Sequence, residues 1–79
     1  MSPTTINFSY VSVHGKRTKK LHTTDTPLLA LMKFFGKFGT VYTAKIVDGS
    51  TVVIEFPEGF LEVFNVSIEG KRGPKPLVQ

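Results

Sequence analysis

The sequence predicts an α+β fold, an antiparallel sheet with helices packed on one of its faces. Three observations between residues 28 and 56 predict it. Apolar residues recur in Leu28–Phe38 at the spacing of a helix with one buried stripe. β-Branched and aromatic residues fill Thr40–Val47 and Ser50–Phe56, as they do in strands. Asp48-Gly49 lies between these two segments, and this dipeptide favours a two-residue type I′ hairpin turn.

The predicted strand that ends at Phe56 has two faces. One face holds Val52, Ile54 and Phe56, which alternate with Thr51, Val53 and Glu55. We expect the first three to be buried against the apolar stripe of the helix, which consists of Leu28, Leu31, Met32 and Phe35. The Phe residues elsewhere in the chain are expected mainly in the core.

Length and composition predict a single domain. The chain has 79 residues, 41% of them hydrophobic, so residues 1–79 form one small core, with residues 1–5 expected to be frayed. The chain has no cysteine, which excludes a disulfide framework and fits an intracellular protein better than a small secreted one. No apolar run approaches the roughly 18 residues of a membrane span, and the start MSPTTINFSY is unlike a signal peptide. We therefore expect no membrane interaction.

The segment before the helix begins with a strand. Ile6–Val13 alternates, with Ile6, Phe8 and Tyr10 on one face, and either face could be the buried one. Lys16–Asp25 fits a basic loop or a second strand, which would pair with the first through a tight turn. Leu21 is its only strong apolar residue, which favours the loop.

The helix has clear end signals. Thr26 fits the N-cap and Pro27 the first helical position. Gly36 weakens the last turn, and Gly39 is the residue expected just past the helix end.

The C-terminal third contains one ambiguous segment. Pro57-Glu58-Gly59 ends the strand before it. Phe60–Ile68 fits a helix or a strand, and its β-branched residues favour the strand. The final PKPLVQ fits a short edge strand, where proline is tolerated.

The stretch FFGKFGTVYTAKI followed by GSTVVIEF resembles the RNA recognition motif (RRM) family. In that family the first helix commonly ends with Phe and Phe-Gly before a Val, and the matching residues here are Phe35, Phe38, Gly39 and Val41. Gly49–Phe56 matches the end of the family's RNP1 octapeptide at Ile54 and Phe56. The resemblance implies an RRM/ferredoxin-like two-layer sandwich with the order βαββαβ, a four-stranded antiparallel sheet and a helix over Phe60–Ile68.

The alternative architecture is a β-grasp (ubiquitin-like) domain with the order ββαβββ. HGKRTKKLHT would then be the return arm of an N-terminal hairpin, and FLEVFNVSI would be the last strand.

The stacking positions of the RRM family are poorly matched. RNP1 offers aromatics for base stacking at its third and fifth places, which hold Thr51 and Val53 here, and its leading basic residue is replaced by Gly49. On the first strand, Tyr10 is the best candidate for a stacking aromatic.

Two basic clusters carry seven of the ten cationic side chains, namely Lys16, Arg17, Lys19 and Lys20, and then Lys71, Arg72 and Lys75. Such clusters neutralise phosphates and so give affinity for polyanions, or they are solvated loops that keep the chain soluble. The RRM topology would bring both clusters to the same end of the sheet. Lys45 is a further candidate contact on the sheet.

These residues predict a non-catalytic binding module. The first hypothesis is weak binding of single-stranded RNA or another polyanion by the sheet face, the basic clusters and Tyr10. The alternative is a protein-interaction module, for which Phe34 is the candidate contact because it lies off the buried stripe of the helix. No arrangement of residues indicates a catalytic site or a cofactor, and His14 and His22 alone are too weak a signal for a metal site.

Overall fold

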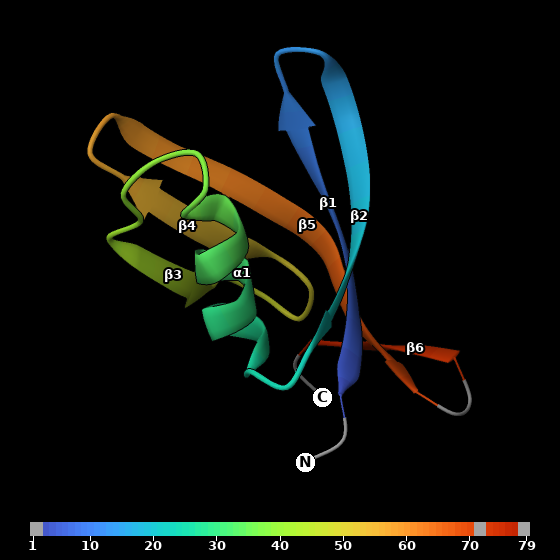
Figure 1. Ribbon diagram of the computed structural model, residues 1–79. Coiled ribbons are helices and arrows are strands. Elements are labelled where there is room, and N and C mark those ends of the chain that lie inside the picture. Colours follow the sequence, from blue (N-terminus) through green and yellow to red (C-terminus); the bar gives the residue numbers. More distant parts are fainter. Residues whose placement is uncertain (1–2, 71–72, 78–79) are drawn as a thin grey trace.

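The structure is a computed structural model that describes residues 3–70 and 73–77, and of residues 70 and 73–76 only the backbone is described. One helix and six strands follow one another in these ranges (Figure 1). In chain order they are β1 Thr4–Ser12, β2 Gly15–Thr23, α1 Pro27–Phe35, β3 Thr43–Ile46, β4 Val52–Phe56, β5 Gly59–Gly70 and β6 Gly73–Pro76. Thr4 and Thr5, within the segment expected to be frayed, already belong to β1.

The strands form one antiparallel sheet in the order β2-β1-β5-β4-β3, and β6 pairs with the far end of β5. The long strand β5 lies at the centre, since it pairs with β1, β4 and β6. Figure 1 shows α1 lying across one face of the sheet, over β3 and β4, while the tip of the β1–β2 hairpin projects beyond the other strands. We call the face away from α1 the open face.

The predicted RRM/ferredoxin-like order βαββαβ is therefore wrong. Two strands precede the helix, and Phe60–Ile68, which that order requires as a second helix, lies within β5. The β-grasp order ββαβββ is wrong as a whole, because β6 follows the strand that should be the last, but its N-terminal hairpin and its strand at Phe60–Ile68 are confirmed. Phe60–Ile68 forms a strand for a local reason, because its β-branched residues lose side-chain freedom in a helix and pack well on a sheet.

The segment Lys16–Asp25 is not a loop, because most of it forms β2. Its ladder with β1 runs from the pair Thr4 and Thr23 to the pair Ser12 and Gly15. An edge strand over the end of a small core needs few apolar side chains. Leu21, which lies opposite Ile6 and packs against the core, is enough.

The helix begins as predicted and ends earlier. Thr26 Oγ1 accepts a hydrogen bond from the N–H of Leu29 at 3.4 Å, and Pro27 is the first helical residue. Gly36 caps the other end, and its N–H donates to the carbonyl of Met32 at 2.8 Å. The expectation that the buried stripe continues to Phe38 is therefore wrong, and Phe38 is 70% exposed.

The connection between β3 and β4 is longer than the predicted two-residue turn. The N–H of Val47 donates to the carbonyl of Thr51 at 2.8 Å, and neither Asp48 nor Gly49 has a positive φ. The Asp48 carboxylate accepts the N–H of Ser50 at 3.0 Å, and this bond holds the pKa of Asp48 below its usual value. Asp48 thus stabilises an Asx-type turn instead of type I′.

A bulge at Asn65 makes β5 change faces. Asn65 has a φ of 55°, and the register with β1 shifts between Asn7 and Ser9. Before the bulge, Leu61 and Val63 point to the helix side while Phe60, Glu62 and Phe64 lie on the open face; after it, Val66 returns to the core. The expectation of a core position for Phe60 is therefore wrong, since this side chain is 73% exposed.

The core lies between α1 and the sheet. Its buried apolar members are Ile6, Phe8, Ala30, Leu31, Phe35, Val52, Ile54, Val63 and Val66. The predicted burial of Val52 and Ile54 against Leu31 and Phe35 is confirmed, and Phe56 is half-buried against the same cluster. No helix in the described part of the chain is long and apolar enough to span a bilayer.

Candidate functional site

The first basic cluster is divided between the two sides of the β1–β2 hairpin. Residues directly opposite one another in an antiparallel pair share a face. Arg17 lies opposite Tyr10 and Lys19 opposite Phe8, so both cations are on the helix side. Lys16 and Lys20 alternate with them and lie on the open face. All four side chains are exposed on β2, which is an edge strand.

The lysines of the open face already have partners. The Nζ of Lys16 lies 5.3 Å from the ring centroid of Phe64. The Nζ of Lys20 lies 3.3 Å from a carboxylate oxygen of Glu69, and the Nζ of Lys45 lies 3.2 Å from one of Glu55. These contacts lower the availability of three of the predicted cations to an incoming anion.

Hydrogen bonds as well as charge lower the pKa values of the acidic partners, Glu69 and Glu55. A hydrogen bond from the Asn7 amide, followed by the bond and charge of Lys20, holds the pKa of Glu69 below its usual value. The hydroxyl of Thr43, followed by Lys45, lowers the pKa of Glu55 in the same way. Both carboxylates are therefore charged at neutral pH and balance their lysines.

A cleft of about 480 Å³ opens on the helix side, between the hairpin tip, the end of α1 and the β4–β5 turn. Its lining is mainly apolar and aromatic, with Tyr10, Val11, Ser12, His14, Phe35, Phe38, Gly39, Phe56, Glu58 and Leu61. Tyr10 packs edge-on against Phe35 with 5.2 Å between the ring centroids, and Phe38 lies 6.5 Å from the same ring. A concave, mostly apolar site with a few polar groups is typical of ligand clefts.

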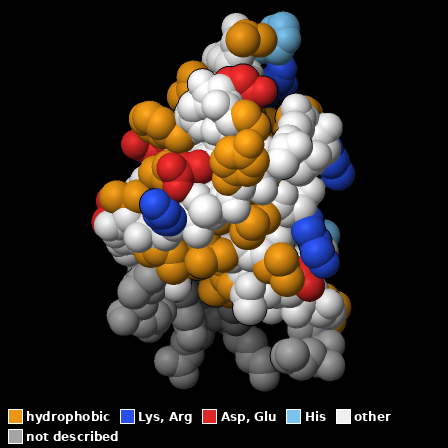
Figure 2. Space-filling view, turned by 90° about the vertical axis from the view of Figure 1, so that its left-hand side faces the viewer, with side chains coloured by type: hydrophobic (Ala, Val, Ile, Leu, Met, Phe, Trp, Pro, Cys, Tyr) orange, Lys and Arg blue, Asp and Glu red, His pale blue; other side chains and the backbone are white. Residues whose placement is uncertain are grey.

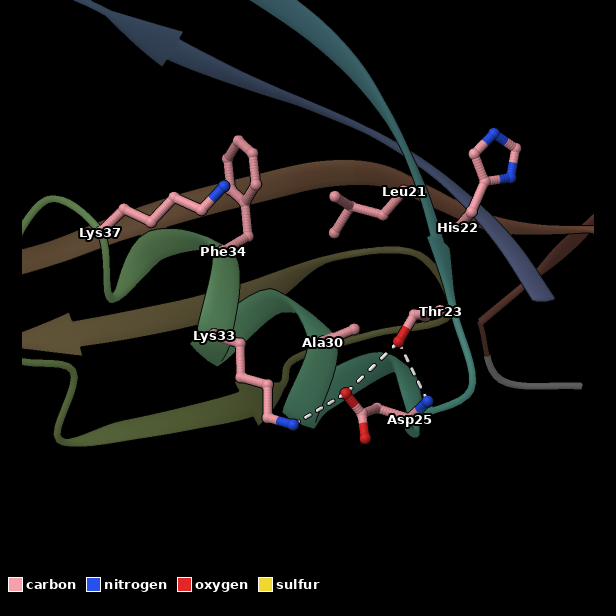
Figure 3. A pocket seen from close by; sticks show the side chains of 8 residues that line it. All are labelled: Leu21, His22, Thr23, Asp25, Ala30, Lys33, Phe34 and Lys37. Carbon is pink, nitrogen blue, oxygen red and sulfur yellow. Dashed lines mark hydrogen bonds and ion pairs between the residues drawn. The ribbon is translucent and has the colours of Figure 1, made fainter. Parts of the chain in front are cut away.

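A smaller hollow of about 190 Å³ lies further along β2, between its last residues and α1 (Figure 3). Asp25 accepts a hydrogen bond from the Nζ of Lys33 at 3.0 Å, which neutralises that lysine. The Nζ of Lys37 lies 5.6 Å from the ring centroid of Phe34. Phe34 lines this hollow and Phe35 lines the cleft. Both sites therefore lie on the helix side of the β1–β2 hairpin, which is also the side of Arg17 and Lys19 on β2.

The structure places the two predicted aromatic contacts on this same side. Tyr10 is half-buried and belongs to an aromatic cluster that includes Phe8, Phe34 and Phe35. Phe34 is also half-buried, with its ring centroid 5.0 Å from that of Phe35. Both rings contribute to the packing of the domain. Tyr10 also lines the cleft, and Phe34 also lines the smaller hollow.

The second basic cluster is described only in part. Lys71 and Arg72 lie outside the described residues, and of Lys75 only the backbone is described, opposite Ile68 in the β5–β6 ladder. The RRM topology, which would bring both basic clusters to the same end of the sheet, is absent. β6 pairs with the end of β5 that adjoins the start of β1. Lys20 reaches this end, where it contacts Glu69, whereas Lys16 lies beside the hairpin tip.

Comparison with protein-family models, with curated proteins and with solved structures gives no match. The chemistry of the cleft and of β2 is therefore the basis for assigning a function. Within the described ranges, no group of three or more His, Cys, Asp or Glu side chains is placed to hold a metal ion.

The cleft as such was not predicted from the sequence, because its walls come from three separate segments. Phe38, Phe56 and Leu61 meet there only after the hairpin and the β4–β5 turn have formed. The one local signal is Gly36. A helix that ends at this glycine leaves Phe38 in the following turn, where its ring is free to line a surface.

Proposed function

We propose that this chain is a non-catalytic module that binds single-stranded nucleic acid, RNA in the first place, on the helix side of the β1–β2 hairpin. The observation that carries the proposal is the position of the aromatic cleft beside an edge strand with four exposed cations. Sites for single strands combine these two features, a basic track for the phosphates and aromatic faces for the bases.

The phosphate contacts are assigned first to Arg17 and Lys19. Both side chains are exposed, and neither forms an ion pair with a described residue. Lys16 and Lys20 project from the other face of the same edge strand, so a phosphate chain that follows the edge passes between the two pairs. The second pair contributes less, because Lys20 must leave Glu69 and Lys16 must leave Phe64.

The bases are assigned to the cleft. Phe38 is 70% exposed at its mouth and Tyr10 forms part of its wall. Stacking of a base on an aromatic side chain contributes roughly 1–3 kcal/mol, and it requires a base that is not paired within a duplex. This requirement favours single strands over double strands.

Fluorescence anisotropy with a labelled oligouridine of about 12 nucleotides tests the proposal over a series of salt concentrations. If about four phosphates are engaged, the log–log salt slope should be near −3, from about 0.7 per phosphate. A duplex of equal length should bind more weakly. Absence of binding to the single strand at low salt would overturn the proposal and favour a protein-interaction module.

A matched pair of variants tests the assignment of the cleft. Phe38 and Phe60 are similarly exposed, at 70% and 73%, but Phe60 lies on the open face. Phe38→Leu should lower the affinity at least about fivefold with little change in salt slope, from about 1 kcal/mol of stacking per base. Phe60→Leu should leave the affinity unchanged. The reverse result would move the bases to the open face.

A further inference from the structure

The described lining of the aromatic cleft includes one acidic side chain. Glu58 comes from the β4–β5 turn, is exposed, and forms no ion pair with a described residue. Figure 2 views the molecule from the side that is on the left in Figure 1, where this turn lies, and shows acidic and hydrophobic side chains next to one another in the upper part of the view. A carboxylate repels phosphates, so Glu58 fits another part of a nucleotide.

The other polar groups of the cleft do not select between bases. Ser12 Oγ is engaged in the hairpin turn, where it donates to the carbonyl of Gly15 at 3.2 Å and accepts the N–H of His14 at 3.1 Å. A tyrosine hydroxyl and a neutral imidazole each offer a donor and an acceptor, so Tyr10 and His14 can adapt to more than one base edge. A carboxylate only accepts hydrogen bonds, which makes Glu58 the discriminating group.

The Watson–Crick edges of the four RNA bases differ in what they offer to a carboxylate. Guanine has two adjacent donors, N1–H and the N2 amino group, which match the two carboxylate oxygens. Adenine and cytosine place one amino donor beside a ring-nitrogen acceptor, and uracil places its N3–H between two carbonyl oxygens. With these three bases a carboxylate oxygen faces a lone pair, which is unfavourable. In a single strand this edge is free to be read.

We infer that the cleft selects guanine, with the Glu58 carboxylate accepting hydrogen bonds from N1–H and the N2 amino group of a base stacked on Phe38. The inference rests on the proposed function and names the base that the cleft takes. Stacking alone tolerates every base, whereas hydrogen bonds to a charged acceptor are strong and directional. Arg17 and Lys19 lie on β2, so a different element holds the flanking phosphates.

The preference is measured with the labelled oligouridine of the binding assay, varied at its central nucleotide, which carries uracil, guanine, adenine or hypoxanthine. The guanine oligonucleotide should bind at least about fivefold more tightly than the adenine one, because adenine is a purine of similar stacking surface that offers one donor. Hypoxanthine keeps N1–H and lacks the N2 amino group, so its affinity should lie between these two.

Glu58→Gln and Glu62→Gln form a matched pair of variants. Each removes one negative charge from an exposed glutamate, but Glu62 lies on the open face. Loss of a negative charge favours every oligonucleotide, so the measured quantity is the ratio of the guanine affinity to the adenine affinity. Glu58→Gln should bring this ratio below about two, because the amide replaces one acceptor by a donor. Glu62→Gln should leave the ratio unchanged.

The outcomes separate this inference from the proposed function. If the oligonucleotides bind but the guanine and adenine affinities are equal, or adenine is preferred, guanine selection is overturned and single-strand binding stands. A preference for guanine that persists in Glu58→Gln, or that Glu62→Gln removes to the same extent, also overturns the inference. If no oligonucleotide binds at low salt, the proposed function and this inference are both overturned.

Discussion

The two edges of the sheet are opposite in character. β2 has nine residues, of which only Leu21 packs against the core, and its four cations are exposed. β3 has four residues, its one cation is paired with Glu55, and exposed apolar side chains flank it. Both edges present free backbone groups, so the difference lies in the side chains, which carry four exposed cations at β2 and one paired cation at β3.

The comparison shows why basic residues alone do not identify a nucleic-acid site. Lysines on an edge strand prevent aggregation whether or not they touch a ligand. What distinguishes β2 is the aromatic cleft on one of its sides, together with the absence of acidic partners for Arg17 and Lys19 among the described residues.

Removal of all cations from β2 should have the largest effect. Replacement of Lys16, Arg17, Lys19 and Lys20 by Gln should lower the affinity for oligouridine by roughly two to three orders of magnitude near 0.1 M salt, since each phosphate contact contributes about 0.7 to the salt slope. The salt slope should approach zero. Anisotropy titrations over a salt series measure these outcomes.

A charge-preserving variant is the control for this prediction. Exchange of each lysine of β2 for arginine, and of Arg17 for lysine, keeps the charge and should keep the salt slope. An unchanged slope in the Gln variant would place the phosphates elsewhere and contradict the assignment to β2.

Replacement of the cations in pairs should separate the two faces of β2. Arg17→Gln with Lys19→Gln should lower the affinity about tenfold more than Lys16→Gln with Lys20→Gln, because the second pair is already engaged by Phe64 and Glu69. Both variants lose two charges, so anisotropy compares them directly at the same salt concentration. Equal losses would mean that the phosphate chain follows the edge without preference for the cleft.

Loss of the side-chain partners of Glu69, Asn7 and Lys20, should have the smallest effect, a change in the pKa of Glu69 that a pH titration measures. Glu69 has its pKa lowered from 4.5, first by Asn7 and then by Lys20. Its contribution to stability is therefore complete above the unfolded value of 4.5 and is lost as the pH falls through the lower folded value. Carboxyl chemical shifts should show a midpoint below 4.5 that rises in Asn7→Ala and rises less in Lys20→Gln. A midpoint that does not move in Asn7→Ala would contradict this account.

Local patterns were sufficient to predict several elements. The helix start at Thr26, the strand with Val52 and Ile54 buried, and the end of that strand at Pro57 depend on neighbouring residues alone. Capping, alternation and the missing N–H of proline act over a few residues, so the sequence by itself contains the information.

The fold that the family resemblance implied was wrong for the opposite reason. The residues around Phe35, Phe38 and Gly39 fit the end of a helix in the RRM order, and this order required a second helix at residues 60–68. Strand propensity correctly opposed that helix, but the bulge at Asn65 concealed the face on which Phe60 and Phe64 lie. A single residue with positive φ reverses which side chains face the core, and the hydrophobic pattern of the sequence does not indicate where such a residue lies.

Neighbouring residues specify the helix cap, the buried alternation of β4 and the run of four cations in five residues. Strand pairing places these cations on an edge strand, puts two of them on the same side as Tyr10, and joins Phe38 and Leu61 with Tyr10 in one cleft. These features cannot be predicted locally, because faces and edges depend on which strands pair. Pairing between β1 and β5 joins residues more than fifty positions apart, such as Tyr10 and Val63, and no local pattern specifies such a contact.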